Sequence, residues 1–260
     1  MKTVLLFLFV FYTSTCNSQV KDSLNYDSIA NTIETKSNKH TTVKTIALAA
    51  GYTGATYICY RYFDTDIKNF ALSIQNKTVS SITQTAEDAG LGASSIVITT
   101  ATALTSIITK DKKLQKTAIL LVGGHIINDI VTNQFKITFQ RHRPNTGDPY
   151  NTFDWRGGPK INLSFISSHT SNAFATATAF ATVYKDSKWV PAVAYSVASL
   201  VGLCRIYNNA HWASDVMAGA AVGFASVKAM NGLYNVAAKK FTFIPQVNNG
   251  HYTISFICAL

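Results

Sequence analysis

The stretch CRIYNNAHWASD, residues 204–215, places a histidine six residues after an arginine and four residues before an aspartate. In a helix, His211 and Asp215 are i,i+4 neighbours on one face. A carboxylate that accepts the Nδ1 proton of an imidazole fixes its tautomer and leaves Nε2 with a free lone pair, which a histidine nucleophile needs. Arg205 is expected in the turn that leads into this helix, within reach of an oxyanion held in front of His211.

An earlier stretch, KITFQRHRP over residues 136–144, supplies two more cations. Lys136 and Arg143 are seven residues apart, about two helical turns, so a helix would carry both on one face. Pro144 is expected to end that helix. Phosphoryl transfer needs positive donors around the equatorial oxygens of phosphorus, and Lys136, Arg143 and Arg205 together can provide them.

Between these stretches, SFISSHTSNAF over residues 164–174 predicts the start of a small-residue helix over 171–182. The first turn of a helix offers unpaired N–H groups and a positive dipole, both of which suit an anion. Ser167 and Ser168 precede this helix, and Ser167 adds a hydroxyl donor. His169 lies in the same turn, where an imidazole can protonate a leaving oxygen.

Each of these residues also has an ordinary structural explanation when taken alone. Lys136 is then a solvated surface residue, Ser167 an N-cap and Asp215 an acid favoured by the helix dipole. Arg205 is then a cation at a helix start, and His125, elsewhere in the chain, fits best as a core histidine. The functional hypothesis depends on the joint occurrence of the motif residues at these spacings.

The rest of the chain predicts an all-α fold. It has 260 residues, enough for one substantial core, and only 14% of them are charged, against about 25% in soluble domains. Ala-rich apolar segments of helix length recur near residues 43–62, 92–109, 115–135, 170–185, 189–204 and 212–230. Residues 89–109 are uncharged and long enough to span a membrane, but eight Ser and Thr residues dilute their hydropathy. We therefore favour an exported bundle, soluble or peripheral to a membrane, over the rival prediction of an integral membrane bundle.

The N-terminal region predicts export. Residues 1–18 have the basic start and short apolar core of a signal peptide, which directs a chain to the periplasm or cell envelope. Lipidation at Cys16 is the weaker alternative. Residues 19–41 are a polar lead-in.

A helical domain is predicted over residues 42–235, followed by a tail over 236–260. The tail alternates in period two on both sides of Asn249-Gly250, a strong hairpin turn signal. It therefore predicts a short C-terminal β-hairpin appended to the bundle.

The net charge of +10 does not indicate a nucleic-acid partner, because no Lys/Arg-rich block with interleaved aromatic residues occurs. The charge fits solubility or attraction to an anionic membrane surface. No Cys or His spacing typical of a metal site is present in the sequence, so no metal or other cofactor is expected. The pattern does not indicate an oligomeric state.

The three stretches resemble the signature of the type 2 phosphatidic acid phosphatase and vanadium haloperoxidase superfamily, which is K-x6-R-P, then P-S-G-H, then S-R-x5-H-x3-D. The resemblance is to the phosphatase branch and implies a helical bundle of the type 2 phosphatidic acid phosphatase kind. Three positions depart from it: Ile166, Ser168 and Cys204 stand where the pattern has proline, glycine and serine. If position 168 needs a positive φ, serine there costs about 1 kcal/mol.

The resemblance implies a metal-independent phosphatase that hydrolyses phosphomonoesters through a phospho-histidine intermediate. His211 is then the nucleophile, Asp215 orients it and His169 is the general acid. The phosphate is held by the five other motif residues, Lys136, Arg143, Ser167, Ser168 and Arg205. Export and an apolar bundle favour a lipid or envelope phosphate as substrate, with a small soluble phosphomonoester also compatible.

Two alternatives remain open from the sequence. In a vanadium-dependent haloperoxidase the same pocket would hold vanadate ligated by His211, but such enzymes tend to be much longer. A non-catalytic anion-binding envelope protein would explain the changes at Ile166 and Ser168. Loss of function, however, usually removes chemical residues before flanking ones.

Overall fold

The computed structural model describes residues 39–86, 94–156, 158, 162–248 and 251–258. The predicted signal peptide, most of the polar lead-in and the Asn249-Gly250 turn lie outside these described residues. The chain divides into two units, residues 1–48 and residues 49–260. The architecture below is that of the second unit.

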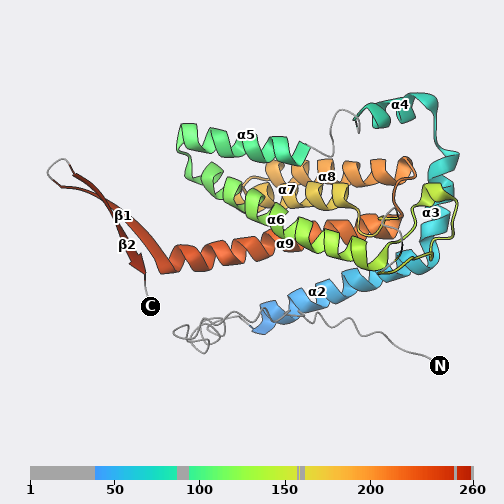
Figure 1. Ribbon diagram of the computed structural model, residues 1–260, viewed down its shortest axis with the longest axis horizontal. Coiled ribbons are helices and arrows are strands. Elements are labelled where there is room, and N and C mark those ends of the chain that lie inside the picture. Colours follow the sequence, from blue (N-terminus) through green and yellow to red (C-terminus); the bar gives the residue numbers. More distant parts are fainter. Residues whose placement is uncertain (1–38, 87–93, 157, 159–161, 249–250, 259–260) are drawn as a thin grey trace. The chain divides into compact units, whose positions relative to one another are not determined.

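The described chain is mostly helical, which confirms the all-α prediction. The helices are α2 (Lys39–Ile58), α3 (Asp64–Ser73), α4 (Lys77–Ala86), α5 (Ser94–Thr109), α6 (Lys112–Phe139), α7 (Ser168–Val183), α8 (Trp189–Tyr207) and α9 (Ala213–Lys240) (Figure 1). A π-helical turn, η1 (Cys59–Phe63), joins α2 to α3, and a 3-10 turn, η3 (Pro144–Thr146), follows α6. Helices α3 and α4 were not predicted, because each has only ten residues and neither contains an apolar run of helix length.

At the C-terminal end, α9 continues to Lys240, past the predicted domain boundary at residue 235. Two strands follow, β1 (Phe241–Asn248) and β2 (His251–Cys258). They pair antiparallel, with Phe243 opposite Phe256.

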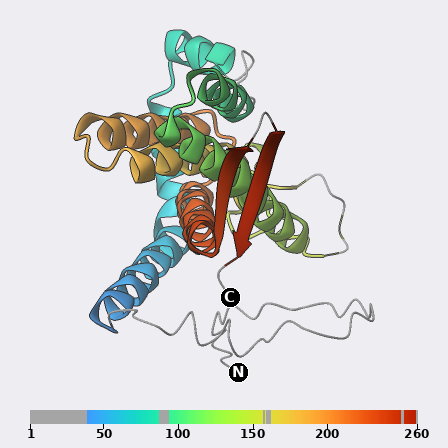
Figure 2. The same cartoon turned by 90° about the vertical axis from the view of Figure 1, so that its left-hand side faces the viewer.

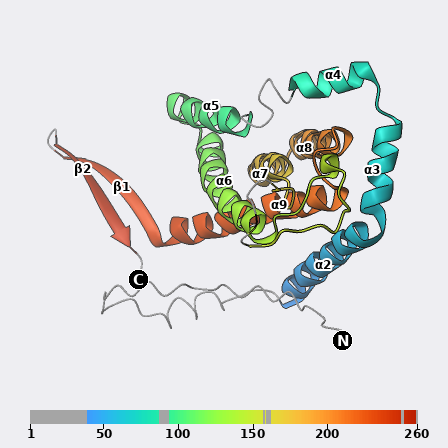
Figure 3. The same cartoon turned by 45° about the vertical axis from the view of Figure 1, so that its right-hand side comes forward.

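Helix α7 is the centre of the bundle. It packs against α6, α8 and α9, and Figure 3 shows these helices grouped around it. Its sequence, SHTSNAFATATAFATV, is dominated by small side chains, so neighbouring helices can approach on several sides. The fully buried apolar core is small and consists of Leu120, Leu121, Ala175, Ala179 and Val227.

Helix α9 approaches α7 more closely than any side chain would allow at two positions. A Cβ atom at Gly223 would lie 2.0 Å from the carbonyl oxygen of Ser171, and one at Gly219 would lie 2.7 Å from that of Ser167. In Figure 2, α9 is seen nearly end-on beside α6 and α7. The two glycines therefore let the second and third turns of α9 approach the first turn of α7, which carries His169.

Large apolar side chains cover the outer faces of the bundle. Those at least half exposed include Ile96, Val97, Leu104, Ile107 and Ile108 on α5, Ile126 and Ile130 on α6, Trp189, Val193, Val197, Leu200 and Leu203 on α8, and Leu233 on α9. Two helical segments, Trp189–Tyr207 and Ala213–Ala238, are long and apolar enough to cross a membrane, and only 17% and 22% of their most apolar windows are buried. Core helices of soluble proteins are mostly buried, so this exposed apolar surface supports association with a membrane.

Gly223→Ala tests the close α7–α9 contact. The added methyl group meets the backbone of Ser171 and Ala175, which cannot yield as a flexible side chain can, so we expect a loss of about 1–3 kcal/mol in stability, measured by unfolding of the purified protein. Gly232→Ala is the matched control on the same helix, because nothing lies within 4 Å of its Cβ position. There, alanine should be neutral or stabilising by up to about 1 kcal/mol. Equal stability of the two variants would contradict the contact.

Candidate active site

Three motif cations converge from separate parts of the chain. Lys136 lies in the last turn of α6 and Arg205 in the last turn of α8, and both are buried, at 9% and 7% exposure. Arg143 is half-buried in the extended segment after α6. The charges of Arg143 and Arg205 both act on Lys136, so the three lie close together. Because like charges repel at short range, this cluster is built to hold an anion.

The chain reaches this arrangement differently from the prediction. Helix α6 ends at Phe139, where Gln140 adopts a left-handed φ of 45° and its N–H bonds the carbonyl oxygen of Lys136. Arg143 is therefore not on the same helix face as Lys136, and Pro144 begins η3 instead of ending α6. Because α6 ends at Phe139, the residues that follow it can turn back into the core.

Two further local predictions are wrong. Arg205 belongs to the end of α8, not to the turn before α9. His211 precedes the first residue of α9, so it is not on one helix face with Asp215. The turn between the two helices is closed by backbone N–H groups of Ala210 and His211 that bond the carbonyl oxygen of Arg205. This turn carries His211 to the cations.

The imidazole of His211 is held on its Nδ1 side. Nδ1 lies 3.4 Å from the Ser164 hydroxyl and 3.7 Å from Asp215 Oδ2. The Ser164 hydroxyl donates its proton to Asp215 Oδ2 at 2.5 Å, so toward His211 it can only accept. Nδ1 therefore carries the proton, and Nε2 keeps its lone pair. The predicted carboxylate–imidazole pair is thus supplemented by a serine that the sequence analysis did not assign.

The electrostatics of this site keep His211 neutral. Its side chain is 2% exposed, and burial lowers the pKa of His211 to about 4. The hydrogen bond and negative charge of Asp215 oppose this shift, whereas the positive charges of Arg143 and Lys136 add to it. At neutral pH the imidazole is therefore uncharged and its lone pair is available.

The second motif forms the first turn of α7, which begins at Ser168, three residues earlier than predicted. Ser167 is the N-cap and is fully buried, its N–H bonds the carbonyl oxygen of Asp215 at 3.2 Å, and its hydroxyl contacts that of Thr170 at 3.0 Å. Ser168 and His169 are only half-buried. Both are therefore more accessible than Ser167.

Arg141 lies at the centre of a buried network beneath the site. Its guanidinium donates to Asp215 Oδ1 at 2.6 Å and to Asp64 Oδ2 at 2.7 Å. The remaining N–H groups bond the Ser214 hydroxyl and, twice, the carbonyl oxygen of Tyr150. All five donors of the side chain are thus used, and Arg141 is 1% exposed.

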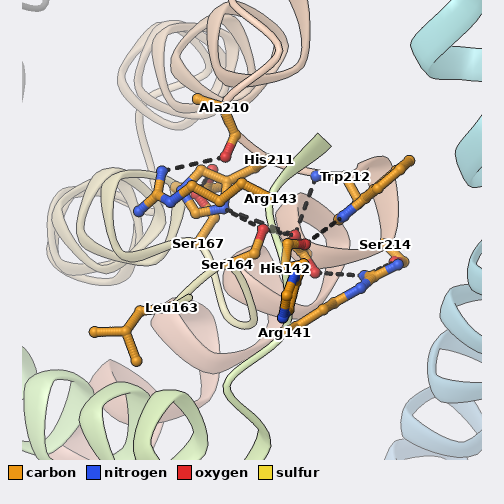
Figure 4. A network of polar contacts seen from close by, with 12 residues as sticks. Arg141, His142, Arg143, Leu163, Ser164, Ser167, Ala210, His211, Trp212 and Ser214 are labelled. Atoms are coloured by element: carbon orange, nitrogen blue, oxygen red, sulfur yellow. Dashed lines mark hydrogen bonds and ion pairs between the residues drawn. The ribbon is translucent and has the colours of Figure 1, made fainter. Parts of the chain in front are cut away.

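Figure 4 shows this network beside His211, with Arg141, Ser214 and Trp212 on the side away from Arg143. The indole of Trp212 stacks near the Arg141 guanidinium, 5.3 Å from ring centre to Cζ. The backbone N–H of Trp212 donates to Asp215 Oδ2 at 3.0 Å, as a residue at the start of a helix does to an acid in its first turn. The Asp215 carboxylate is therefore held in place before a ligand binds, by contacts with Arg141, Ser164, His211 and Trp212.

His142, between Arg141 and Arg143, organises the loop that follows. Its ring nitrogens bond Asp148 at 2.7 Å and Asp154 at 3.0 Å, and Asn162 donates to Asp154 at 3.0 Å. Partial burial disfavours the charged imidazole, but the bonds to Asp154 and Asp148 outweigh it and raise the pKa of His142. Because the two carboxylates contact opposite ring nitrogens, they do not converge on one point. Among the described residues, no group of three or more His, Cys, Asp or Glu side chains is placed to hold a metal ion.

Comparison with known proteins agrees with this geometry. The model of the PAP2 superfamily, the type 2 phosphatidic acid phosphatases, matches residues 117–238, which include all three motifs. The match thus identifies the segment that carries the site as PAP2-like. The crystal structure of a transmembrane PAP2-type phosphatidylglycerolphosphate phosphatase from Bacillus subtilis superposes with a TM-score of 0.54 at 17% identity, covering 74% of this chain and 96% of that one. Aquifex aeolicus LpxE superposes with a TM-score of 0.50 at 17% identity, covering 65% and 94%.

Two curated PAP2-domain relatives come from Porphyromonas gingivalis. A lipid A 1-phosphatase is 42% identical over 104 residues, which are 40% of this chain and 19% of that protein. A lipid A 4′-phosphatase is 30% identical over 122 residues, 43% of this chain and 50% of that protein. The matched regions thus cover half or less of these relatives.

The departures from the PAP2 pattern are accommodated by the fold. Non-glycine residues with positive φ in the described part of the chain are Lys110, Gln140, Trp155 and Asn209, and Ser168 is not among them. The expected backbone penalty for serine therefore does not apply. Ile166 is buried at 1% exposure and packs against the Gly219 backbone of α9, so an apolar side chain fills this place.

Sequence reasoning missed three residues that position the PAP2 site. Ser164 and Arg141 lie inside the stretches 164–174 and 136–144. Ser164 could have been noticed as a polar residue three positions before Ser167, and Arg141 as a second arginine two positions before Arg143. Asp64 had no such signal. It lies outside the matched region and contacts Ser214, 150 positions away.

Arg141→Ala tests the buried network. The change leaves the carboxylates of Asp64 and Asp215 buried without their cation, so we expect a loss of about 3–5 kcal/mol in the free energy of unfolding, measured by chemical denaturation. Arg61→Ala is the control, since Arg61 makes one exposed hydrogen bond to Tyr150 and should change stability by less than about 0.5 kcal/mol. Wild-type stability of Arg141→Ala would show that the network does not hold the site.

Proposed function

We propose that this chain is a phosphatase that hydrolyses phosphate monoesters of membrane lipids through a phospho-histidine intermediate on His211. The observation that carries the proposal is the pairing of a buried, neutral His211 with three cations from three segments. Nδ1 of His211 is occupied by Ser164 and Asp215, so only Nε2 is available for attack.

The cations Lys136, Arg143 and Arg205 supply the charge that the reaction needs. A phosphate monoester dianion carries its charge on the equatorial oxygens in the transition state. Two of the three cations are almost fully buried, where electrostatic interactions are stronger than in water, and they are in place before the substrate binds. In this proposal they take the part that a metal ion plays in other phosphatases, so no metal is assigned a role.

In the first step, the lone pair on Nε2 of His211 forms a bond to phosphorus as the bond from phosphorus to the ester oxygen breaks. His169, as an imidazolium, gives its proton to that oxygen, and the lipid alcohol leaves. The phosphorylated imidazole is positively charged and keeps its Nδ1 proton. The Asp215 carboxylate stabilises this charge through the Ser164 hydroxyl.

In the second step, neutral His169 takes a proton from a water molecule whose oxygen attacks phosphorus. The phosphorus–Nε2 bond breaks, its electron pair returns to His211, and inorganic phosphate is released. His169 is again an imidazolium. Its half-buried position is consistent with contact to both a leaving group and water.

Three observations support a lipid as the substrate. The outer faces of α5, α6 and α8 are apolar and exposed, two helical segments can cross a membrane, and the curated relatives include phosphatases of lipid A. We therefore place the bundle in a membrane, with the site near one membrane face. The predicted export signal favours the periplasmic face and lipid A or another envelope phosphate as the substrate.

The leaving group distinguishes the roles of the two histidines. An alkyl or lipid alkoxide is a poor leaving group, so we expect His169→Ala to slow its single-turnover release by about 10²–10⁴-fold. p-Nitrophenolate leaves without a proton, so the same variant should lose much less on p-nitrophenyl phosphate. His211→Ala should abolish turnover of both substrates. His125→Gln changes a histidine outside the site and should retain turnover of both substrates.

The assays compare a lipid A monophosphate with p-nitrophenyl phosphate in detergent and EDTA. Equal losses on both substrates for His169→Ala would show that His169 binds phosphate or supports structure. Activity that EDTA abolishes and a divalent ion restores would contradict the proposal that cations alone replace the metal.

A further inference from the structure

A second concentration of positive charge lies at the other end of the bundle. A cavity of about 600 Å³ opens between the start of α6, the end of α7 and the C-terminal half of α9, where α6 begins at the left of Figure 1. Five lysines line it, and no acidic residue does: Lys112, Lys113, Lys116, Lys185 and Lys228. The active-site proposal uses none of them.

The cavity and the active site are separated by about the thickness of a membrane interior. Lys116 lines the cavity and Lys136 the site on the same helix, and twenty residues of α helix rise roughly 30 Å, close to the hydrocarbon core of a bilayer. Helices α7 and α9 run between the same two ends, and their intervening residues, 170–183 and 216–227, carry no charged side chain. On α6, Asp129 is the one Asp, Glu, Lys or Arg residue between Lys116 and Lys136. The lysine cavity therefore faces the membrane surface opposite the site.

The lysines are held without carboxylate partners. Lys113 and Lys116 lie over the rings of Tyr184 and Tyr234, and Lys228 donates to the Thr182 hydroxyl at 3.2 Å. Within the described part of the chain, none of the five forms an ion pair, and Asp111 at the start of α6 is used by the N–H groups of the first turn. Such a cluster gains stability when an anion enters it.

The cavity also contains an unused acceptor. Asn231 lines it, and its Oδ1 is buried without a hydrogen-bond donor among the described residues. The ionised phosphodiester of a phospholipid has no proton to donate to this oxygen, but a hydroxyl group can donate one. The lining thus suits a phosphate that carries a neighbouring hydroxyl.

We propose that this cavity binds the headgroup of an anionic, hydroxyl-bearing phospholipid such as phosphatidylglycerol, taken from the leaflet opposite the active site. The proposal uses the membrane placement proposed above but not the phosphatase chemistry. Basic cavities between membrane helices are suited to acidic lipid headgroups. Lysines act as point charges, so the site selects by charge more than by headgroup shape.

The test measures lipid binding to the full chain in nanodiscs by native mass spectrometry, with phosphatidylglycerol against phosphatidylcholine. Lys116→Gln/Lys228→Gln should weaken phosphatidylglycerol retention about 30-fold, from the contribution of two lysines near a membrane surface. Lys110→Gln/Lys188→Gln is the matched control, because it removes the same charge from the same end at residues that do not line the cavity. Equal loss of phosphatidylglycerol retention in both double variants would show that the charge of the whole surface attracts the lipid. That result would overturn the proposed site.

Two further experiments use the wild-type protein. The first distinguishes a lipid phosphate from a soluble phosphate as the ligand, and the second locates the bound lipid. Inorganic phosphate or glycerol phosphate that displaces the lipid at equal concentration would show a site for soluble anions and overturn the lipid assignment. In the wild-type protein, phosphatidylglycerol with a photoreactive headgroup should crosslink to residues 112–116 and 181–185. Crosslinks distributed elsewhere, or no preference over phosphatidylcholine, would also overturn it. Because these readouts measure binding, an inactive enzyme would not affect their outcome.

Discussion

The arrangement of the site depends on the buried guanidinium of Arg141. It joins the carboxylates of Asp64 and Asp215 and uses every N–H donor it has. A buried carboxylate is stable only when paired, so the position of Asp215 is set by Arg141, and Asp215 in turn sets Ser164 and His211. The orientation of His211, the proposed nucleophile, is therefore set by this buried network before a substrate binds.

The inward position of Arg141 also explains the path of the backbone around the site. Helix α6 stops at Phe139 because Arg141 must turn inward, and a helix continued to Pro144 would carry its side chain along the helix surface. The left-handed residue Gln140 makes that turn. Arg143 then reaches the phosphate side of the site from an extended segment, and Lys136 reaches it from the helix. The small residues of α7 and the glycines of α9 bring the second and third motifs against each other.

The motif residues and the helical class could be predicted from the sequence, because both follow from local spacing and composition. Lys136, Arg143 and Arg205 do lie together, and His211 does face Asp215. The sequence could not show that Asp64 completes the network, since the contact joins residues 150 positions apart with no shared pattern. It also could not show that His211 precedes its helix, because i,i+4 spacing fits both a helix face and the turn before a helix. The extent of the exposed apolar surface was underestimated because Ser and Thr lower the mean hydropathy of α5, although Ser95, Thr102 and Ser106 are buried against the bundle.

If His211 is the nucleophile, it carries the phosphoryl group during turnover. The most direct test mixes excess protein with a lipid monophosphate, quenches within one turnover in alkali, where phosphoryl-histidine survives, and maps the modified peptide by mass spectrometry. With p-nitrophenyl phosphate, whose leaving group needs no proton, His169→Ala should accumulate more of the intermediate, because the water that hydrolyses it is then not activated. Phosphate is expected on His211, removed by acid and missing in His211→Ala. Phosphate on another residue, or full single-turnover hydrolysis with unmodified His211, would contradict it.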